Sequence, residues 1–379
     1  MDQTGQLGGA ELCLLDLVLA RKAGAFSDRV VLMQDGPFAQ RLRESEIDVS
    51  IEELGESGRI RKESSLFTKL GSVGRVWSVS RKLAALARDY DAIYANTPKA
   101  LIMGVVAAFL AKKPLVYHLH DILSASHFSS SSLRLLVAFA NRSQQVIANS
   151  QASQNAYQDA GGRTESLVVY NGFDPGSYAE RPDAIDAIRR ELRLGEGGAA
   201  VAVFGRLAPW KGQHIAIEAV QRLEDVRLFI VGDALFEEED YRRRLEEQVV
   251  QLGLSNRVHF LGFRSDVPEL MRAFDVVIHC STAPEPFGRV IVESMFCGTP
   301  VVASSEGGAA EILTHGETGL LASPGDVTEL SEMIRQTLSD HESARERAQK
   351  AYRSAVERFQ LDSVVGQING VIDTVGSRK

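Results

Sequence analysis

Short apolar segments alternate with helix-like segments along most of this chain, and the alternation restricts the fold to few architectures. Each apolar segment is too short for a helix, and most of them are followed by a segment of helical length. Strands joined by helices run parallel, and strands buried on both faces are apolar throughout. The pattern therefore predicts an α/β protein with doubly wound parallel sheets covered by helices. The expected strands are residues 29–33, 49–51, 92–95, 114–118, 145–148, 167–170, 201–204, 227–231, 258–261, 276–279 and 301–304.

The chain of 379 residues is long enough for two domains of ordinary size. Residues 171–184 contain two Gly and two Pro, which indicates a linker between two strand–helix series. We therefore expect two Rossmann-like domains, residues 1–172 and residues 173–360. Two such domains would face each other across a cleft and bind a ligand at the carboxyl ends of their strands.

Composition excludes several classes of protein. The net charge of −8 argues against a nucleic-acid partner. No apolar run is long enough to span a bilayer and the first six residues are polar, so we expect a cytoplasmic protein without a signal peptide. Cys13, Cys280 and Cys297 lack the spacing of metal ligands, and we expect reduced thiols. Nothing in the composition indicates a cofactor.

Residues 283–311 combine a loop, a helix and two carboxylates. Two prolines and a glycine prevent a helix before residue 289, and we expect one over residues 289–297. Glu285 lies in the loop and Glu293 in the helix. The N-terminus of a helix offers unpaired N–H groups and a partial positive charge, which suit a phosphate, whereas carboxylates accept hydrogen bonds from sugar hydroxyls. Together these groups predict a site for a nucleotide sugar.

A basic loop follows the expected strand 201–204. Arg206 and Lys211 lie in this loop, and Lys211 comes just before a helix that begins near Gly212. The helix dipole disfavours a cation at that position unless an anion is bound there as well. Arg206 and Lys211 could therefore neutralise a diphosphate.

Two histidines close the expected strand 114–118, where α/β enzymes place functional groups. His118 and His120 point to the same side, and we choose His120 because it lies nearer the loop. Asp89 and Asp91 have the spacing of an Asp-x-Asp metal motif, but they precede a strand and lie at its amino end. We therefore expect no metal site there.

These residues match a known family: the chain resembles the retaining glycosyltransferases of the GT-B fold, specifically glycosyltransferase family 4 (glycosyl transferases group 1). The resemblance covers nearly the whole chain, and Glu285 and Glu293 meet the family's Glu-x7-Glu motif. The supporting matches are Gly8-Gly9-Ala10-Glu11, His120-Asp121, Tyr170-Asn171-Gly172-Phe173-Asp174, Gly205-Arg206, Lys211-Gly212 and Gly298-Thr299-Pro300-Val301-Val302.

The resemblance implies a role for each of these groups. Arg206 and Lys211 would hold the donor diphosphate and stabilise the leaving charge. Glu285 and His120 would contact the transferred sugar, the latter near the reacting carbon. Glu293 would bind the ribose diol. The base would stack near Phe263 or Leu235. The other donor-binding residues would be Gly8, Gly9, Gly205, Phe287, Gly288, Arg289 and Val290.

The resemblance also implies a reaction. A hexose would pass from a UDP- or GDP-sugar to a hydroxyl of a glycan, a lipid-linked acceptor or a small molecule, with retention through front-face attack. Arg and Lys would replace a metal ion, and no cofactor would be needed. Residues 361–379 would form a helix that crosses back to the first domain. We expect acceptor choice in residues 54–66 and 122–131, and peripheral contact with the inner face of the membrane through Arg59, Arg61, Lys62 and Lys69.

Two alternative functions remain open, and the sequence departs from the family's pattern at one place. The chain could be a GT-B sugar-nucleotide epimerase, which would work without an acceptor, or a non-catalytic nucleotide-sugar-binding partner of another transferase. Family members have an apolar strand before the glycine loop, whereas none of the seven residues before Gly8 has strand character. We hypothesise that the chain is truncated at its start.

Overall fold

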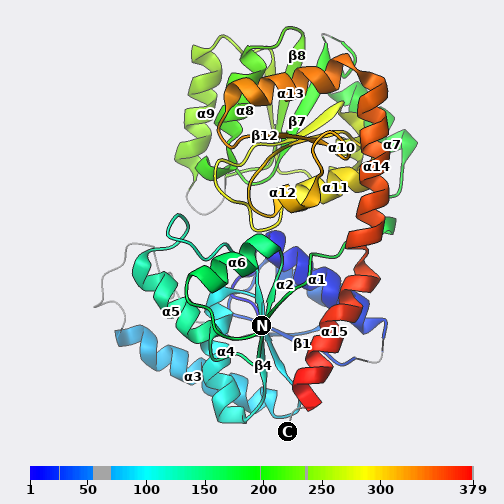
Figure 1. The fold of residues 1–379 in the computed structure, drawn as a ribbon. Coiled ribbons are helices and arrows are strands. Elements are labelled where there is room, and N and C mark those ends of the chain that lie inside the picture. Colours follow the sequence, from blue (N-terminus) through cyan, green and yellow to red (C-terminus); the bar gives the residue numbers. More distant parts are fainter. Residues whose placement is uncertain (25, 54–69, 197, 235–237, 378–379) are drawn as a thin grey trace. The chain divides into compact units, whose positions relative to one another are not determined.

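The computed structural model describes residues 1–24, 26–53, 70–196, 198–234 and 238–377. The chain divides into two compact units, Met1–Gly172 with Leu361–Lys379 and Phe173–Gln360 (Figure 1). Each unit is built on parallel strands joined by helices, so the predicted fold class is confirmed. Residues 54–66, where we expected an acceptor-binding segment, lie outside the described part of the chain.

The first unit contains two sets of parallel strands. A pair is formed by β1 (Arg29–Leu32) and β2 (Asp48–Ile51). A four-stranded sheet contains, in order, β3 (Ile93–Ala95), β4 (Leu115–Leu119), β5 (Gln145–Ala148) and β6 (Ser166–Val168). Its helices are α1 (Gly9–Lys22), α2 (Pro37–Glu44), α3 (Leu70–Ala87), α4 (Pro98–Ala111), α5 (Ser130–Ala140), α6 (Gln151–Asp159) and α15 (Leu361–Ser377).

Met1 and Asp2 lie between the two sets of strands of the first unit. The backbone of Asp2 exchanges hydrogen bonds of 3.0 and 3.2 Å with β1 and the residue after it. The backbone of Met1 exchanges bonds of 2.7 and 3.0 Å with β3 and the residue that follows it. The expectation that no residue before Gly8 has strand character is therefore wrong for Asp2, which forms a parallel bridge with β1.

The second unit has one six-stranded parallel sheet, in the order β12-β11-β10-β7-β8-β9. Its strands are β7 (Ala199–Phe204), β8 (Val226–Val231), β9 (Val258–Gly262), β10 (Val276–His279), β11 (Val301–Ser304) and β12 (Leu320–Ala322). Its helices are α7 (Pro182–Glu191), α8 (Gln213–Gln221), α9 (Glu239–Gln251), α10 (Val267–Ala273), α11 (Arg289–Cys297), α12 (Ala309–Ile312), α13 (Val327–Ser339) and α14 (His341–Phe359), with short 3-10 turns η3 (Pro175–Tyr178) and η4 (Pro209–Lys211).

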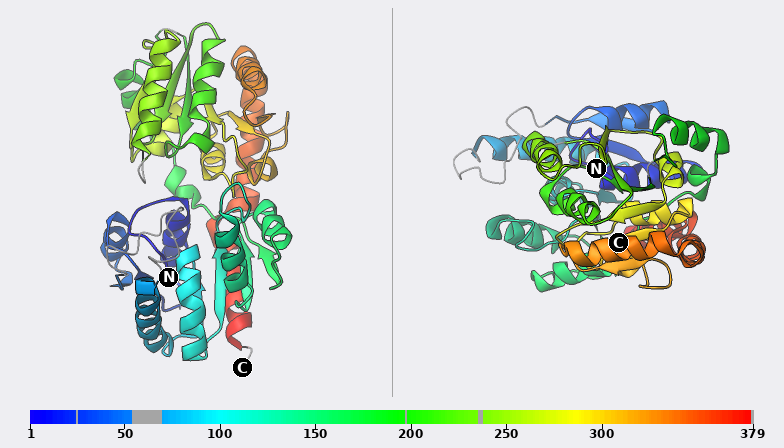
Figure 2. Two further views of the ribbon diagram at one scale, coloured as in Figure 1. Left: turned by 90° about the vertical axis from the view of Figure 1, so that its left-hand side faces the viewer. Right: turned by 90° about the horizontal axis from the view of Figure 1, so that it is seen from above.

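The core of the second unit lies on both faces of its sheet, because successive side chains of a strand point to opposite faces. In β7, Val201 and Val203 pack with α8, α9 and α13, whereas Ala200 and Ala202 pack with α7 and α10. Helices accordingly flank the sheet on both faces (Figure 2). The strand ends that carry the loops of interest therefore rise from a rigid, buried framework.

Candidate functional site

The loop after β7 places Lys211 beside the end of β10. Lys211 ends the short turn η4, and α8 begins two residues later. Gly212, between them, has φ 73°, and a Cβ there would lie 1.9 Å from the carbonyl oxygen of Cys280. Only glycine allows the two backbones to approach this closely. The loop therefore lies directly against the segment that leads from β10 to Glu285.

Lys211 and Glu285 form an ion pair inside the second unit. The Lys211 Nζ atom lies 2.8 Å from Oε1 and 2.7 Å from Oε2 of Glu285. The side chains are 20% and 11% exposed. Burial alone would raise the pKa of Glu285, but Lys211 and His279 outweigh it and hold that pKa well below its usual range. Glu285 is therefore a carboxylate at neutral pH.

Two further side chains support the same carboxylate from inside the protein. Ser281 Oγ donates to Glu285 Oε2 at 3.0 Å, and His279 Nε2 lies 3.4 Å from that oxygen. The backbone of Glu285 is also held, because its carbonyl accepts the Gly308 N–H at 2.7 Å. We did not predict Ser281 or His279. Their place at the carboxyl end of β10, next to β7, was the available signal.

Helix α11 begins immediately after the loop of Glu285, at the predicted residue. Its cap, Gly288, has φ 102°, and the first N–H groups of the helix face outward from that end. Glu293 Oε1 lies 3.4 Å from Nε of Arg289, one helical turn earlier. Phe287 is buried at 2% exposure, and its side chain belongs to the core.

The remaining predicted residues of the second unit lie at neighbouring strand ends. Gly205 and Arg206 follow β7, and the Arg206 carbonyl accepts a bond of 3.0 Å from Gln213. Phe263 follows β9, and the residue is 77% exposed. Val290 lies in the first turn of α11. The structure thus joins Lys211 to Glu285 and Arg289 to Glu293 directly.

His120 lies just beyond β4 in the first unit, where we placed it. Its Nε2 atom lies 3.0 Å from Oδ1 of Asn96, and its ring lies 3.9 Å from the ring of His118. The Tyr94 hydroxyl hydrogen-bonds to Nδ1 of His118. Burial, with a contribution from His120, lowers the pKa of His118 well below its usual value, so that ring is neutral.

The Asn96 amide has a defined orientation. Its Nδ2 atom donates to Oδ2 of Asp2 at 2.7 Å and to the carbonyl oxygen of Ala10 at 3.1 Å. A backbone carbonyl can only accept, so the nitrogen must face Ala10 and the oxygen must face His120. His120 therefore carries a hydrogen on Nε2. Sequence reasoning missed Asn96 and Asp2, which lie 94 residues apart in the chain.

Gly8 and Gly9 lie at the start of α1, as predicted. The Gly8 N–H donates to Glu11 Oε2 at 3.1 Å and so caps the helix. Burial and the nearby Asp2 carboxylate raise the pKa of Glu11 to about 8. Burial likewise lowers the pKa of the Met1 amino group to about 6. The start of the chain thus places several titratable groups in the interior of the first unit.

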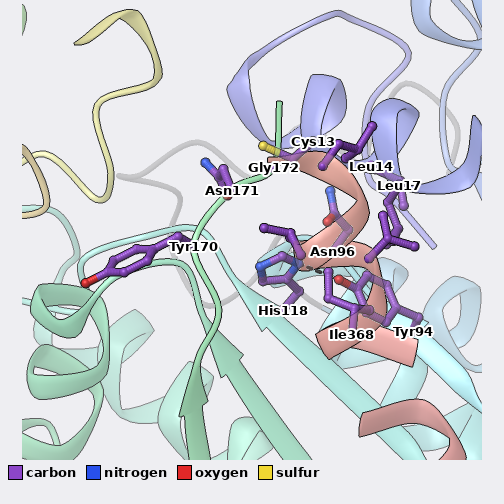
Figure 3. A pocket seen from close by; sticks show the side chains of 13 residues that line it. Cys13, Leu14, Leu17, Tyr94, Asn96, His118, Tyr170, Asn171, Gly172 and Ile368 are labelled. Atoms are coloured by element: carbon purple, nitrogen blue, oxygen red, sulfur yellow. Dashed lines mark hydrogen bonds between the residues drawn. The ribbon is translucent and has the colours of Figure 1, made fainter. Parts of the chain in front are cut away.

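The first unit contains a pocket, and Figure 3 shows the side chains that line it. Apolar side chains of α1 and α15 line most of it, and His118, Asn96 and Asn171 supply the polar part. Among the residues that the structure describes, Nε2 of His118 and Oδ1 of Asn171 have no hydrogen-bond partner. We had singled out Asn171 only as part of a motif.

The described residues contain no cluster of His, Cys, Asp or Glu that could hold a metal ion. Asp89 and Asp91 lie in the turn between α3 and β3. In the ranges that the structure describes, no helix has both the length and the apolar character needed to cross a bilayer. Arg59, Arg61, Lys62 and Lys69 lie outside those ranges, as does Leu235.

Comparison with known proteins gives consistent matches in both units. Residues 8–177 match the model of Glycosyltransferase Family 4, and residues 184–354 match that of Glycosyl transferases group 1. The chain is similar to HepE of Anabaena in crystal structures with UDP and glucose (45% identity, TM-score 0.89) and with UDP-glucose (44% identity, TM-score 0.89), and each match covers 98% of both chains.

Curated relatives are more distant. The lipopolysaccharide core biosynthesis glycosyltransferase LpsE of Rhizobium meliloti (strain 1021) is 31% identical over 58% of this chain, and that match spans only 61% of LpsE. The N-acetyl-alpha-D-glucosaminyl L-malate synthase of Bacillus anthracis is 28% identical over 69% of this chain and 70% of its own length.

Proposed function

Because the chain belongs to the group 1 glycosyltransferases of the GT-B fold, we propose that it transfers a hexose from a UDP-sugar to an acceptor hydroxyl with retention of configuration. The ion pair of Lys211 with Glu285 is the observation that carries this proposal. It places a cation for phosphate and an acceptor for hydroxyls within hydrogen-bond distance of each other. HepE was solved with UDP-glucose, which makes UDP-glucose our first candidate donor.

The proposed donor site assigns one part of the nucleotide sugar to each group. Lys211 and Arg206 bind the diphosphate, and the N–H groups at the start of α11 assist them. Glu285 accepts hydrogen bonds from the transferred sugar, and Glu293 binds the ribose diol. The exposed ring of Phe263 is proposed to stack on the base.

The proposed chemistry requires little proton transfer by the protein. The bond between the sugar C1 atom and the diphosphate oxygen breaks, and the acceptor oxygen bonds to C1 on the same face. The acceptor's proton passes to the leaving diphosphate. Lys211 and Arg206 stabilise the charge that develops on this leaving group, so the proposal requires no metal ion. His120 is proposed to contact the donor sugar near C1.

The acceptor is proposed to be a glycan, a lipid-linked sugar or a small molecule on the cytoplasmic side of the membrane. The name of LpsE supports a role in the synthesis of a surface polysaccharide. We also propose peripheral membrane contact for a lipid-linked acceptor. Co-sedimentation with anionic vesicles tests this point, and a chain that stays in the supernatant at low salt would contradict it.

The donor site can be tested by thermal unfolding with UDP-, GDP- and ADP-sugars in the presence of EDTA. A ligand that binds only the folded protein raises the melting temperature, and at about 100 times its dissociation constant it adds about 2.7 kcal/mol. We expect a shift with UDP-glucose that Lys211→Ala and Arg206→Ala each abolish. A well-folded sample that shows no shift with any nucleotide sugar would contradict the proposed function.

A further inference from the structure

We propose that Ser281 and His279 position the Glu285 carboxylate, holding its Oε2 atom from inside the protein so that Oε1 meets the donor sugar. Both residues would act through Glu285 and not on the substrate itself. This inference rests on the proposed function, because it assumes that a donor sugar hydroxyl binds at Glu285. It adds a reason why that carboxylate has one orientation.

The three side chains form a closed hydrogen-bonded group. Ser281 Oγ lies 3.0 Å from Glu285 Oε2, and His279 Nε2 lies 3.2 Å from Ser281 Oγ and 3.4 Å from Oε2. Ser281 is 1% exposed, His279 is 4% exposed and Glu285 is 8% exposed. Water therefore has little access to compete with these contacts.

The hydrogens in this group have only one consistent placement. An ionised carboxylate can only accept, so the single hydroxyl hydrogen of Ser281 points to Glu285 Oε2. Ser281 Oγ then has to accept the contact with His279, which requires a hydrogen on His279 Nε2. This holds whether or not the ring is charged. The one Nε2 hydrogen is shared between Ser281 Oγ at 3.2 Å and Glu285 Oε2 at 3.4 Å, so Ser281 is the main donor to Oε2 and His279 a weaker, shared one.

The two oxygens of Glu285 therefore differ. Oε2 is in hydrogen-bonding contact with Ser281, His279 and Lys211. Among the described contacts, Oε1 accepts a hydrogen bond from Lys211 alone. A phosphate that draws the Lys211 ammonium toward itself would leave Oε2 with two internal donors. Oε1 would then be the oxygen that accepts a hydrogen bond from a sugar hydroxyl.

The segment that carries Ser281 and His279 is itself fixed. Ser304 Oγ, at the end of β11, donates to the carbonyl of Ser281 at 2.8 Å and lies 3.4 Å from that of His279. Neighbouring strands β10 and β11 pair in parallel up to His279. The support of Glu285 is thus part of the sheet, which suits a positioning role.

Calorimetry with UDP and UDP-glucose tests the assignment. UDP lacks the sugar, so Ser281→Ala should leave its affinity unchanged while weakening UDP-glucose about tenfold, the effect of losing one hydrogen bond to a charged group. Ser281→Cys keeps a side chain of similar size with a weaker donor, so it should lose less affinity for UDP-glucose than Ser281→Ala does. Ser331→Ala is the matched control, because Ser331 is also buried but donates to Thr328 in α13.

The outcomes separate the inference from the proposed function. If the wild type binds both ligands and Ser281→Ala weakens both equally or neither, the positioning role is wrong and the function stands. If the wild type binds neither UDP nor UDP-glucose, the proposed function fails and the inference fails with it. Where Ser281→Ala does not fold, Ser281→Cys decides by the same difference between the two ligands.

Discussion

The side-chain oxygen of Asn96 lies 3.0 Å from Nε2 of His120, while its side-chain nitrogen donates to Asp2 and to the carbonyl of Ala10. Both amide hydrogens and the amide oxygen of Asn96 thus have a partner. The arrangement connects the start of the chain to the residue that we propose to contact the donor sugar. It also specifies the tautomer of His120, since the Asn96 oxygen can only accept.

Replacement of Asn96 by Ala should release His120 from this tautomer. We expect kcat to fall about tenfold, because a positioning hydrogen bond is lost, with a smaller change in the affinity for UDP. The side-chain ¹⁵N shifts of His120 should change from those of the Nε2–H form to those of a mixture. Asn155→Ala, on the exposed surface of α6, is the control. Unchanged ¹⁵N shifts in Asn96→Ala would contradict the assignment.

Lys211→Met should destabilise the protein in the absence of any ligand. It leaves a buried carboxylate without its cation, which costs about 3 kcal/mol, as removal of one partner from a buried pair does. Adding Glu285→Gln to Lys211→Met should restore much of this loss without restoring activity. Urea unfolding measures the free energies.

The matched control for Lys211 is Lys82→Met. Lys82 pairs with Glu52 at 2.8 Å, but its side chain is 62% exposed, so the loss should stay below about 1 kcal/mol. Equal losses for Lys211→Met and Lys82→Met would show that the pair with Glu285 is not specially protected from solvent.

Glu11 should make stability depend on pH. Burial and the Asp2 carboxylate raise its pKa from the ordinary value of 4.5 to about 8 in the folded protein, so the folded state favours the protonated form. Its contribution is therefore fully present below pH 4.5 and is lost as the pH rises toward 8, by about 1.4 kcal/mol per unit. The free energy of unfolding of the wild type minus that of Glu11→Gln should fall over this range. A constant difference from pH 5 to 8 would refute the assignment.

Local sequence signals predicted helices and strands well where glycine residues mark their ends. Helix α11 has the predicted bounds because Gly288 and Gly298 both adopt positive φ and end the helix on either side. The expected linker, residues 171–184, includes the first three residues of helix α7, because we interpreted Pro182 as a break. Proline at the first helical position is instead compatible with a helix start. Strand β12 (Leu320–Ala322) was not among the expected strands.

The residues of the candidate site were named one by one from the sequence, but the contacts between them were not predicted. The Lys211–Glu285 contact joins residues 74 positions apart, and it exists because β10 pairs with β7. Hydrophobic periodicity does not reveal the order of strands in a sheet. The contacts of Ser281 and His279 with Glu285 could therefore not be predicted either. The same limit applies to Asp2, whose partners depend on which strands it lies between.

Gly307→Ala should disturb Glu285 through the backbone. Gly307 has φ 67°, and a Cβ there would lie 2.4 Å from the carbonyl oxygen of Glu285 and 2.6 Å from its nitrogen. Gly298 is a matched control, because its φ is 68° and a Cβ would meet nothing within 4 Å. Both variants carry the left-handed strain of about 1 kcal/mol, but only Gly307→Ala adds a collision with the segment that presents the carboxylate. We therefore expect weaker binding of UDP-glucose in Gly307→Ala alone, measured by calorimetry, and equal affinities in the two variants would show that the Glu285 loop tolerates displacement.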